Sequence, residues 1–258
     1  MVQAPQRTAF SGPTLIRLLA RLEDVDVTES RQSLSDRLSQ WIHWTDAIAL
    51  STALNGNPPG IPFGSGAQAV GSVAGSDPAS AEETECARVR STLVNAIAGG
   101  GASAAAKRHG SAQTSSHGAS MSVAVDYPAF RQIYLSMQQT METGIGNLRG
   151  SLRAKLAART PAMSRLAEVD AVMERALGPR ERSLLATVPG LLGGHFDRLR
   201  KAEQGAPAKA ADADTQLSEV APGPWLNVFR KDMQSVLLAE LDLRFQPVEG
   251  LLAALRTR

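Results

Sequence analysis

The sequence predicts an all-α protein, a helical bundle of long amphipathic helices with flexible linkers rich in Gly, Ala, Ser and Pro. Aromatic residues make up only 4% of the chain, and no run of β-branched residues alternates with polar ones, which argues against a sheet. Large apolar residues instead recur at spacings of three, four and seven, the spacing of one helix face. Stretches of small residues separate these segments, so helices joined by linkers are expected.

An N-terminal helical segment is expected over residues 1–56. Its first helix should follow Pro13, because Leu15, Leu18, Leu19 and Leu22 share one helical face. A second, longer helix is predicted to open at Thr28 or Ser30. Its apolar stripe is Leu34, Leu38, Trp41, Ile42, Ile48 and Ala49. It should end near residues 55–56, before two prolines.

Two low-complexity linkers are predicted around a single helix in the next part of the chain. Residues 57–80 and 99–125 consist largely of Gly, Ala, Ser and Pro, which bury too little apolar surface to offset the cost of ordering. The helix between them, over 81–98 or starting from about residue 78, places Cys86 and Leu93 on one apolar stripe.

A C-terminal helical bundle is predicted over 126–258, interrupted by a linker at 204–223. Its longest helix begins after Asp126, and Gly144 and Gly146 mark either a bend or a close helix crossing.

Prolines set the expected helix boundaries in the rest of this bundle. A helix starting at Thr160–Pro161 should stop at Gly178–Pro179, and the helix after it should be kinked or split near Pro189. A final helix opening at Pro224 should break at Pro247, leaving a short terminal helix.

Charge and cysteine content exclude several classes of protein. The 27 basic and 25 acidic residues give a net charge of +2, well short of the excess usual in dedicated nucleic-acid binders. A single cysteine allows no internal disulfide and suits a reducing compartment. No apolar stretch is long enough to span a membrane, so a cytoplasmic location is expected.

The residue types that carry catalysis do not form a recognisable constellation. His109 and His117 lie in a predicted linker, and no two histidines have the spacing of metal ligands. His43 could form a proton-relay pair with Asp46, although a capping or packing role is the simpler interpretation. His195 could flank a pocket, but a half-buried histidine explains it equally simply. Cys86 is interpreted as a small core residue rather than a nucleophile.

One glycine pattern matches a nucleotide-binding motif only in its letters. Residues 64–69 read GSGAQA, which fits G-x-G-x-x-A, yet that loop functions between a strand and a helix, and no strand is predicted before it. No Walker A sequence or nucleophile elbow is present. The sequence therefore predicts no enzymatic activity, cofactor or metal.

Two groups of residues are candidates for interactions. Arg149, Arg153, Lys155 and Arg159 form a basic stripe that could bind phosphate or an acidic helix. The stripe could equally be a solvated helix face, or be neutralised by Glu168, Asp170 and Glu174 of the following helix. Trp41 and Trp44 cannot both face one core from a single helix, so one of them is a candidate interface residue beside His43.

Four segments of the chain, residues 3–27, 30–56, 127–153 and 225–255, resemble an uncharacterised bacterial family, domain of unknown function 3348. They include SRQSLSDRLSQWIHWTDAIALSTALNG and YPAFRQIYLSMQQTMETGIGNLRGSLR. The resemblance carries no catalytic motif. The resemblance implies that the gene lies beside genes for two other proteins. One is a proton-channel-like membrane protein with a long coiled coil, and the other is a peptidoglycan-binding outer-membrane-type protein.

The leading functional hypothesis is a non-enzymatic helical adaptor that binds another protein. The resemblance further implies a cytosolic subunit of an ion-driven bacterial envelope complex. The alternative is a nucleic-acid-associated protein that uses the stripe from Arg149 to Arg159.

Overall fold

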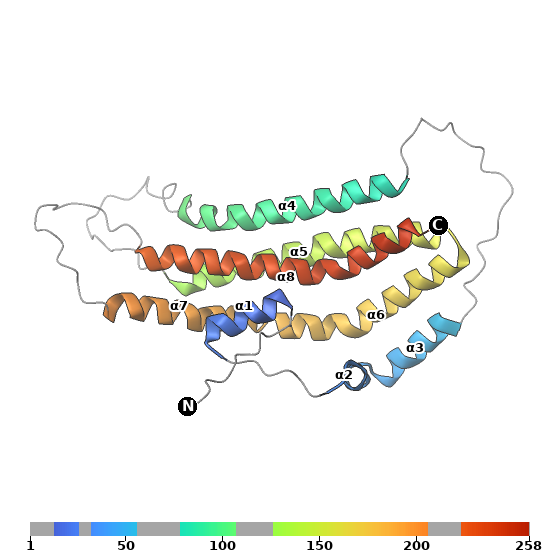
Figure 1. Ribbon diagram of the computed structural model, residues 1–258, viewed down its shortest axis with the longest axis horizontal. Coiled ribbons are helices and arrows are strands. Elements are labelled where there is room, and N and C mark those ends of the chain that lie inside the picture. Colours follow the sequence, from blue (N-terminus) through green and yellow to red (C-terminus); the bar gives the residue numbers. More distant parts are fainter. Residues whose placement is uncertain (1–12, 26–31, 56–77, 107–125, 206–222, 258) are drawn as a thin grey trace, which may run out of the picture. The chain divides into compact units, whose positions relative to one another are not determined.

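The computed structural model describes residues 13–25, 32–55, 78–106, 126–205 and 223–257, and these residues form eight α-helices and no strand (Figure 1). The predicted all-α fold is confirmed. The helices are α1 (Thr14–Glu23), α2 (Leu34–Trp41), α3 (Trp44–Asn55), α4 (Pro78–Ala106), α5 (Tyr127–Ala157), α6 (Pro161–Leu185), α7 (Val188–Gly205) and α8 (Pro224–Arg256).

The chain divides into two compact units, each built from three separate stretches of sequence. Unit 1 comprises Met1–Ser30, Val94–Thr140 and Ala186–Leu243, and unit 2 comprises Arg31–Leu93, Met141–Leu185 and Arg244–Arg258. The division falls inside α4, α5 and α8, so each of these long helices contributes to both units. The units therefore do not follow the segments expected from the sequence, which separated residues 1–56 from a bundle beginning at residue 126.

Unit 1 is built around packed aromatic rings. Rings from α5, α7 and α8 meet with centroids 5.0 to 6.3 Å apart. The aromatic cluster consists of Tyr127, Phe130, Phe196, Trp225 and Phe229. Helix α1 packs on α7, and its Leu15 and Leu22 are buried, as the predicted apolar stripe requires. Arg198 of α7 donates to the carbonyl oxygen of Leu22 at 2.6 Å and thereby holds the C-terminal end of α1.

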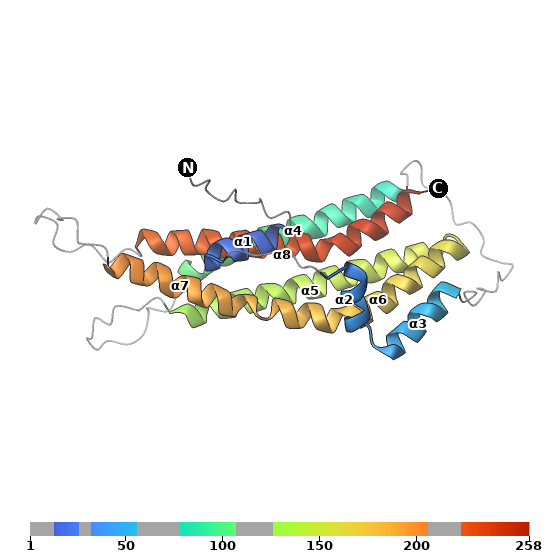
Figure 2. The same ribbon diagram turned by 60° about the horizontal axis from the view of Figure 1, so that its bottom comes forward.

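In unit 2 the helices are joined by a buried apolar layer and by several ion pairs. Both α2 and α3 pack against α6, and Figure 2 shows the two short helices beside it. Buried apolar side chains come from α4, α5, α6 and α8, among them Leu93, Leu152, Leu156 and Leu255. A Cβ on Gly144 would lie 3.7 Å from Leu93 Cδ2, so this glycine marks a close contact of α5 with α4, one of the two predicted alternatives.

Side-chain caps and one unpredicted break define the shorter helices. Ser33 Oγ accepts a hydrogen bond from the backbone N–H of Asp36 at 3.1 Å, so α2 starts later than the predicted Thr28 or Ser30. The single helix expected through residue 55 is two helices, because the chain turns extended at Ile42. The predicted cap at Thr160 is confirmed, since its Oγ1 accepts from Met163 N at 3.2 Å.

Pro179 does not end its helix, contrary to the sequence-based prediction. Helix α6 continues to Leu185, which is buried. A proline inside a helix costs about 3 kcal/mol. Burial of Leu185 acts against this cost, and two partly exposed ion pairs that follow the proline add a smaller contribution: Arg182 pairs with Glu142 of α5 at 2.9 Å, and Glu181 pairs with Arg244 of α8 at 3.4 Å.

Pro247 likewise lies inside α8 rather than breaking it, so the predicted short terminal helix is the last part of one continuous helix. Val248, Leu251 and Leu255 follow the proline and are 0%, 4% and 1% exposed. Burying such a side chain stabilises by roughly 1.5 to 3 kcal/mol, enough in sum to exceed the proline penalty. The predicted split near Pro189 does occur: α6 ends at Leu185, α7 starts at Val188, and Pro189 lies in its first turn.

Helix α4 begins at Pro78, the earlier of the two predicted starts, and continues beyond the predicted end at residue 98. It covers 78–106, so the last residues of the first predicted linker and the first eight of the second are helical. The remaining parts of these linkers, 57–77 and 107–125, lie outside the described residues, as does 206–222 of the third. His109, His117 and the GSGAQA pattern lie outside them as well.

Candidate interaction site

Helices α2 and α3 expose more large apolar side chains than short helices on a protein surface usually do. We call these side chains the α2–α3 surface: Leu34 is 72% exposed, Trp44 76%, Ile48 45% and Leu54 53%. Trp44 and Ile48 are four residues apart in α3 and therefore lie on the same side of it. A tryptophan beside an isoleucine on an exposed helix face is a residue pairing typical of an interaction site.

The sequence of α3 explains why this surface is apolar. The helix reads WTDAIALSTALN and has apolar residues around most of its circumference. It packs against α6, and the residue it buries is the small Ala53, 1% exposed. Because a small residue lies in the buried face, the bulkier Trp44 and Ile48 remain on the opposite, solvent-facing side. The arrangement reverses the usual amphipathic helix, which buries its larger apolar residues.

The two neighbouring tryptophans have different surroundings. Trp41 ends α2 and is partly buried, with the guanidinium carbon of Arg180 in α6 lying 5.7 Å from its ring centroid. This cation–π contact fastens α2 to α6 within unit 2. Trp44 begins α3 and is the exposed member of the pair. The two rings were expected at adjacent edges of one helix stripe, but a break between α2 and α3 separates them, and their environments differ.

His43 lies exposed between α2 and α3, and its backbone is the part that has a defined role. Its carbonyl oxygen accepts the Ala47 N–H at 2.9 Å and so begins α3. No hydrogen bond joins the His43 and Asp46 side chains among the residues that the structure describes. The proton-relay pair considered from the sequence is therefore not formed in this structure, and only the backbone of His43 takes part in starting α3.

The basic stripe is largely neutralised by α6. Arg149 donates to both carboxylate oxygens of Asp170, from Nε at 2.8 Å and from Nη2 at 2.6 Å. Arg153 contacts Asp170 at 3.3 Å and pairs with Glu174. The side chains of Arg149 and Asp170 are only 12% and 15% exposed. Two of the three acidic residues proposed as neutralising partners are thus in place.

The electrostatics of this ion-pair cluster keep Arg149 charged. Burial by itself lowers the pKa of Arg149, but the hydrogen bonds and charge of Asp170, together with Glu174, raise it overall. A bidentate arginine–carboxylate contact is among the strongest ion-pair geometries. Arg149 and Arg153 therefore join α5 to α6 and are not an open phosphate-binding surface.

The other two residues of the stripe also have partners inside unit 2. Lys155 Nζ lies 2.8 Å from Glu82 Oε1 of α4, and Arg159 donates to the carbonyl oxygen of Leu255 in α8. Glu82 is 7% exposed. The hydrogen bond from Lys155 lowers the pKa of Glu82, against the effect of burial, which raises it.

His195 and Cys86 are both enclosed by protein. His195 Nε2 lies 2.9 Å from Asp232 Oδ2, and its side chain is 12% exposed. This pair joins α7 to α8 within unit 1, beside Phe229. Cys86 is 6% exposed, and burial, followed by the charge of Glu85, raises the pKa of its thiol. A thiol with a raised pKa is a poor nucleophile, in agreement with a core role.

A buried polar network in unit 1 escaped the sequence-based analysis. Glu240 of α8 is 0% exposed, and Tyr134 Oη of α5 donates to its Oε2 at 2.7 Å. Gln138 Nε2, one helical turn after Tyr134, donates to both carboxylate oxygens at 3.0 and 3.1 Å. The sequence contains one signal of a buried carboxyl group, because Glu240 lies between the apolar Ala239 and Leu241. The network fixes how α5 and α8 align, because a slip of either helix would leave a buried charge without donors.

The described residues contain neither a membrane-spanning helix nor a metal-ligand cluster. None of the described helices has both the length and the apolar character needed to cross a membrane. Across the described ranges, no three His, Cys, Asp or Glu side chains are grouped so that they could hold a metal ion.

Comparison with known proteins identifies the family. Neither the curated proteins nor the solved structures contain a significant match to this sequence. A family model described as "Protein of unknown function (DUF3348)" matches residues 1–257, nearly the whole sequence. The resemblance noted from the sequence segments is therefore confirmed, and the chain belongs to the DUF3348 family.

Proposed function

We propose that the protein is a non-enzymatic helical adaptor that binds another protein through the α2–α3 surface. The observation that carries this proposal is the exposure of Trp44, 76%, together with Ile48 on the same side of α3. Trp41 supports it, since this residue is fastened against Arg180 and so fixes the helix that precedes Trp44.

The energetics of the surface favour a protein partner. Burying apolar area yields about 25 cal/mol per Å², and tryptophan is among the residues that contribute most to binding when a partner covers them. A partner helix that lays an apolar face across Trp44 and Ile48 would use this area. A helical partner is therefore the class of ligand that the surface fits best.

The family resemblance suggests where such a partner occurs. Genes of this family are expected beside a proton-channel-like membrane protein with a long coiled coil and a peptidoglycan-binding protein. We infer that the partner is a subunit of that ion-driven envelope complex and that this chain is its cytosolic accessory subunit. A long coiled coil would supply the helical face that the α2–α3 surface lacks.

Co-purification from the native host tests the proposal. The tagged full-length chain should recover a partner identifiable by mass spectrometry, and Trp44→Ser with Ile48→Ser should reduce its recovery at least about tenfold, as expected for hot-spot residues. Both positions are exposed, so the substitutions should change the free energy of unfolding by less than about 0.5 kcal/mol each.

Val228→Ser with Ile16→Ser is the matched control, because both residues are exposed and apolar but belong to unit 1. This variant should recover the partner as the unmodified chain does. Recovery of the chain alone as a well-folded monomer, or a partner retained by the Trp44 and Ile48 variant, would argue against the adaptor function.

The nucleic-acid alternative has less support, because Arg149 and Arg153 are paired with Asp170 and Glu174 and Lys155 is paired with Glu82. Charge-reversal variants at these positions would disturb the fold, so the unmodified chain is the better test. Binding to duplex DNA or RNA that weakens steeply with added salt would restore this alternative.

A further inference from the structure

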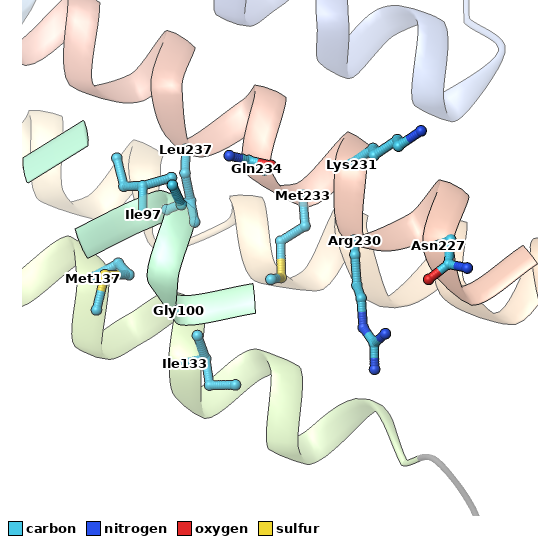
Figure 3. A pocket seen from close by; sticks show the side chains of 11 residues that line it. Ile97, Gly100, Ile133, Met137, Asn227, Arg230, Lys231, Met233, Gln234 and Leu237 are labelled. Atoms are coloured by element: carbon cyan, nitrogen blue, oxygen red, sulfur yellow. The ribbon is translucent and has the colours of Figure 1, made fainter. Parts of the chain in front are cut away.

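Unit 1 contains a pocket that none of the features above uses. It lies among α4, α5 and α8 and has a volume of about 350 Å³, at the lower end of the range for small-molecule sites. Figure 3 shows its lining: Ile97, Met137 and Leu237 lie at one end, and Asn227, Arg230 and Lys231 lie at the other. The pocket therefore has an apolar end and a basic end.

The charge of the lining has one sign. Arg230 and Lys231 are cationic, and none of the described residues that line the pocket is acidic. The nearest residue in sequence with a negative charge, Asp232, is directed to His195 and Arg21 instead, at 2.9 and 3.8 Å. Figure 3 shows the Lys231 side chain directed away from Arg230, so an anionic group at this end of the pocket would be favoured chiefly by Arg230.

Arg230 is held in place by the aromatic cluster. Its guanidinium carbon lies 5.9 Å from the ring centroid of Phe130, which is 1% exposed. A guanidinium that already stacks on a buried ring loses little conformational freedom when it meets an anion. The planar group also matches the geometry of a carboxylate or a phosphate.

A glycine opens the apolar end. A Cβ on Gly100 of α4 would lie 3.6 Å from Ile133 Cγ2 and 4.0 Å from Met137 Sδ, so any larger side chain there would extend into the pocket. The adjacent Gly99 faces open space, with no atom within 4 Å of a Cβ. The two glycines thus differ in whether they border the pocket, although both lie in the same helix.

We propose that this pocket binds an amphipathic anion, a short hydrocarbon chain with one anionic head group. The hydrocarbon lies among Ile97, Met137 and Leu237, and the head group lies against Arg230. A free medium-chain carboxylate and a single-chain phosphate share this chemistry. The site is in unit 1, so it is independent of the α2–α3 surface in unit 2.

Calorimetric titration of the full-length chain with four probes tests the proposal. Decanoate and decyl phosphate carry both features, decyltrimethylammonium has the same chain with the opposite charge, and inorganic phosphate has the charge alone. The first two should bind with one site per chain, and the other two should bind at least about tenfold more weakly. Decyltrimethylammonium reverses the charge that faces Arg230, and inorganic phosphate lacks the chain that buries apolar area. The tighter of the first two identifies the head group.

Variants separate the pocket from general surface binding. Arg230→Met should weaken binding at least about tenfold, whereas Arg131→Met, at an exposed arginine of α5 outside the pocket, should not change it. Gly100→Leu should block binding, and Gly99→Leu should leave it intact. Equal binding of the cationic probe, no binding of either anionic amphiphile, or insensitivity to both Arg230→Met and Gly100→Leu would overturn the proposal. The probe series uses the unmodified chain, so it decides the matter even if a variant folds poorly.

Discussion

The two units of this molecule hold their helices together by different means. Unit 1 packs the rings of Tyr127, Phe130, Phe196, Trp225 and Phe229, and every ring–ring contact found among the described residues lies within it. Unit 1 also has ion pairs between helices, from Arg198 to Glu23 and from His195 to Asp232. Unit 2 combines a buried apolar layer with a larger set of ion pairs among its described residues. These link Arg149 to Asp170, Arg153 to Glu174, Lys155 to Glu82, Arg90 to Glu249, Arg182 to Glu142, Arg244 to Glu181 and Arg256 to Glu83.

One helical fold can therefore depend on packed aromatic rings in one part and on ion pairs in another, although the same long helices run through both. Packed rings are insensitive to salt and to pH, whereas ion pairs weaken with salt and with protonation of their carboxylates. The interaction surface and the pocket divide in the same way. The α2–α3 surface belongs to the ion-paired unit, and the basic pocket belongs to the aromatic one.

Removing a central ring should have the largest effect on stability. Phe196 is 0% exposed and contacts four other rings, so Phe196→Ala should lower the free energy of unfolding by about 3 to 5 kcal/mol. Urea unfolding followed by Trp225 fluorescence, with Trp41 and Trp44 replaced by Phe, reports on unit 1 directly. Val228→Ala, at a residue 47% exposed, is the control and should change little. A loss under about 1 kcal/mol for Phe196→Ala would show that the ring contacts are not the main source of stability in unit 1.

Breaking the most buried ion pair should have the next largest effect. Arg149→Met leaves Asp170 enclosed with only Arg153 nearby, and we expect a loss of about 3 kcal/mol in urea unfolding. Arg88→Met removes an exposed pair with Glu85 within α4 and should leave the urea unfolding curve nearly unchanged. Equal costs for the two variants would mean that burial does not distinguish the ion pairs of unit 2.

A pair of glycines in α7 tests how closely unit 1 is packed. A Cβ on Gly193 would lie 2.9 Å from Tyr127 Cε1, inside the contact limit, whereas one on Gly190 meets nothing within 4 Å. Gly193→Ala should therefore lower the free energy of unfolding by about 1 to 2 kcal/mol, because the ring cannot move freely in the cluster. Gly190→Ala should raise it by up to about 1 kcal/mol through helix propensity. Thermal unfolding of both variants measures the difference, and a stabilised Gly193→Ala would show that Tyr127 has room to shift.

The smallest expected effect is a pH dependence located in unit 2. The hydrogen bond from Lys155 lowers the pKa of Glu82 in the folded chain, so this pair adds stability above the unfolded-state pKa and loses it as the pH falls through the lowered folded-state pKa. Because Lys155 is 45% exposed, we expect roughly 1 kcal/mol or less. Urea unfolding from neutral to acidic pH should show a shallower loss for Glu82→Gln than for the unmodified chain. Glu83→Gln, at the adjacent exposed carboxylate, should keep the steeper loss of the unmodified chain, and identical curves for all three would contradict the assignment.

The local features of the fold followed from the sequence. The spacing of apolar residues predicted the helices, Thr160 predicted a helix cap, and the apolar stripe around Cys86 predicted a buried thiol. These features depend on contacts between residues only a few positions apart. The exposed tryptophan and the neutralised basic stripe were each among the alternatives that the sequence allowed. What the sequence could not give was the choice between those alternatives, since the deciding partners lie on other helices.

Tertiary structure alone decided where helices continue and what they enclose. Pro179 and Pro247 are local stop signals, yet α6 and α8 run through them. Apolar side chains beyond each proline are buried, Leu185 in α6 and Val248, Leu251 and Leu255 in α8. Glu240 can be buried in α8 because Tyr134 and Gln138 of α5 donate hydrogen bonds to its carboxyl group. The pocket beside Arg230 likewise exists only where α4, α5 and α8 meet. Periodicity determines that a helix forms, but packing between segments distant in sequence determines its length, its neighbours and the sites between them.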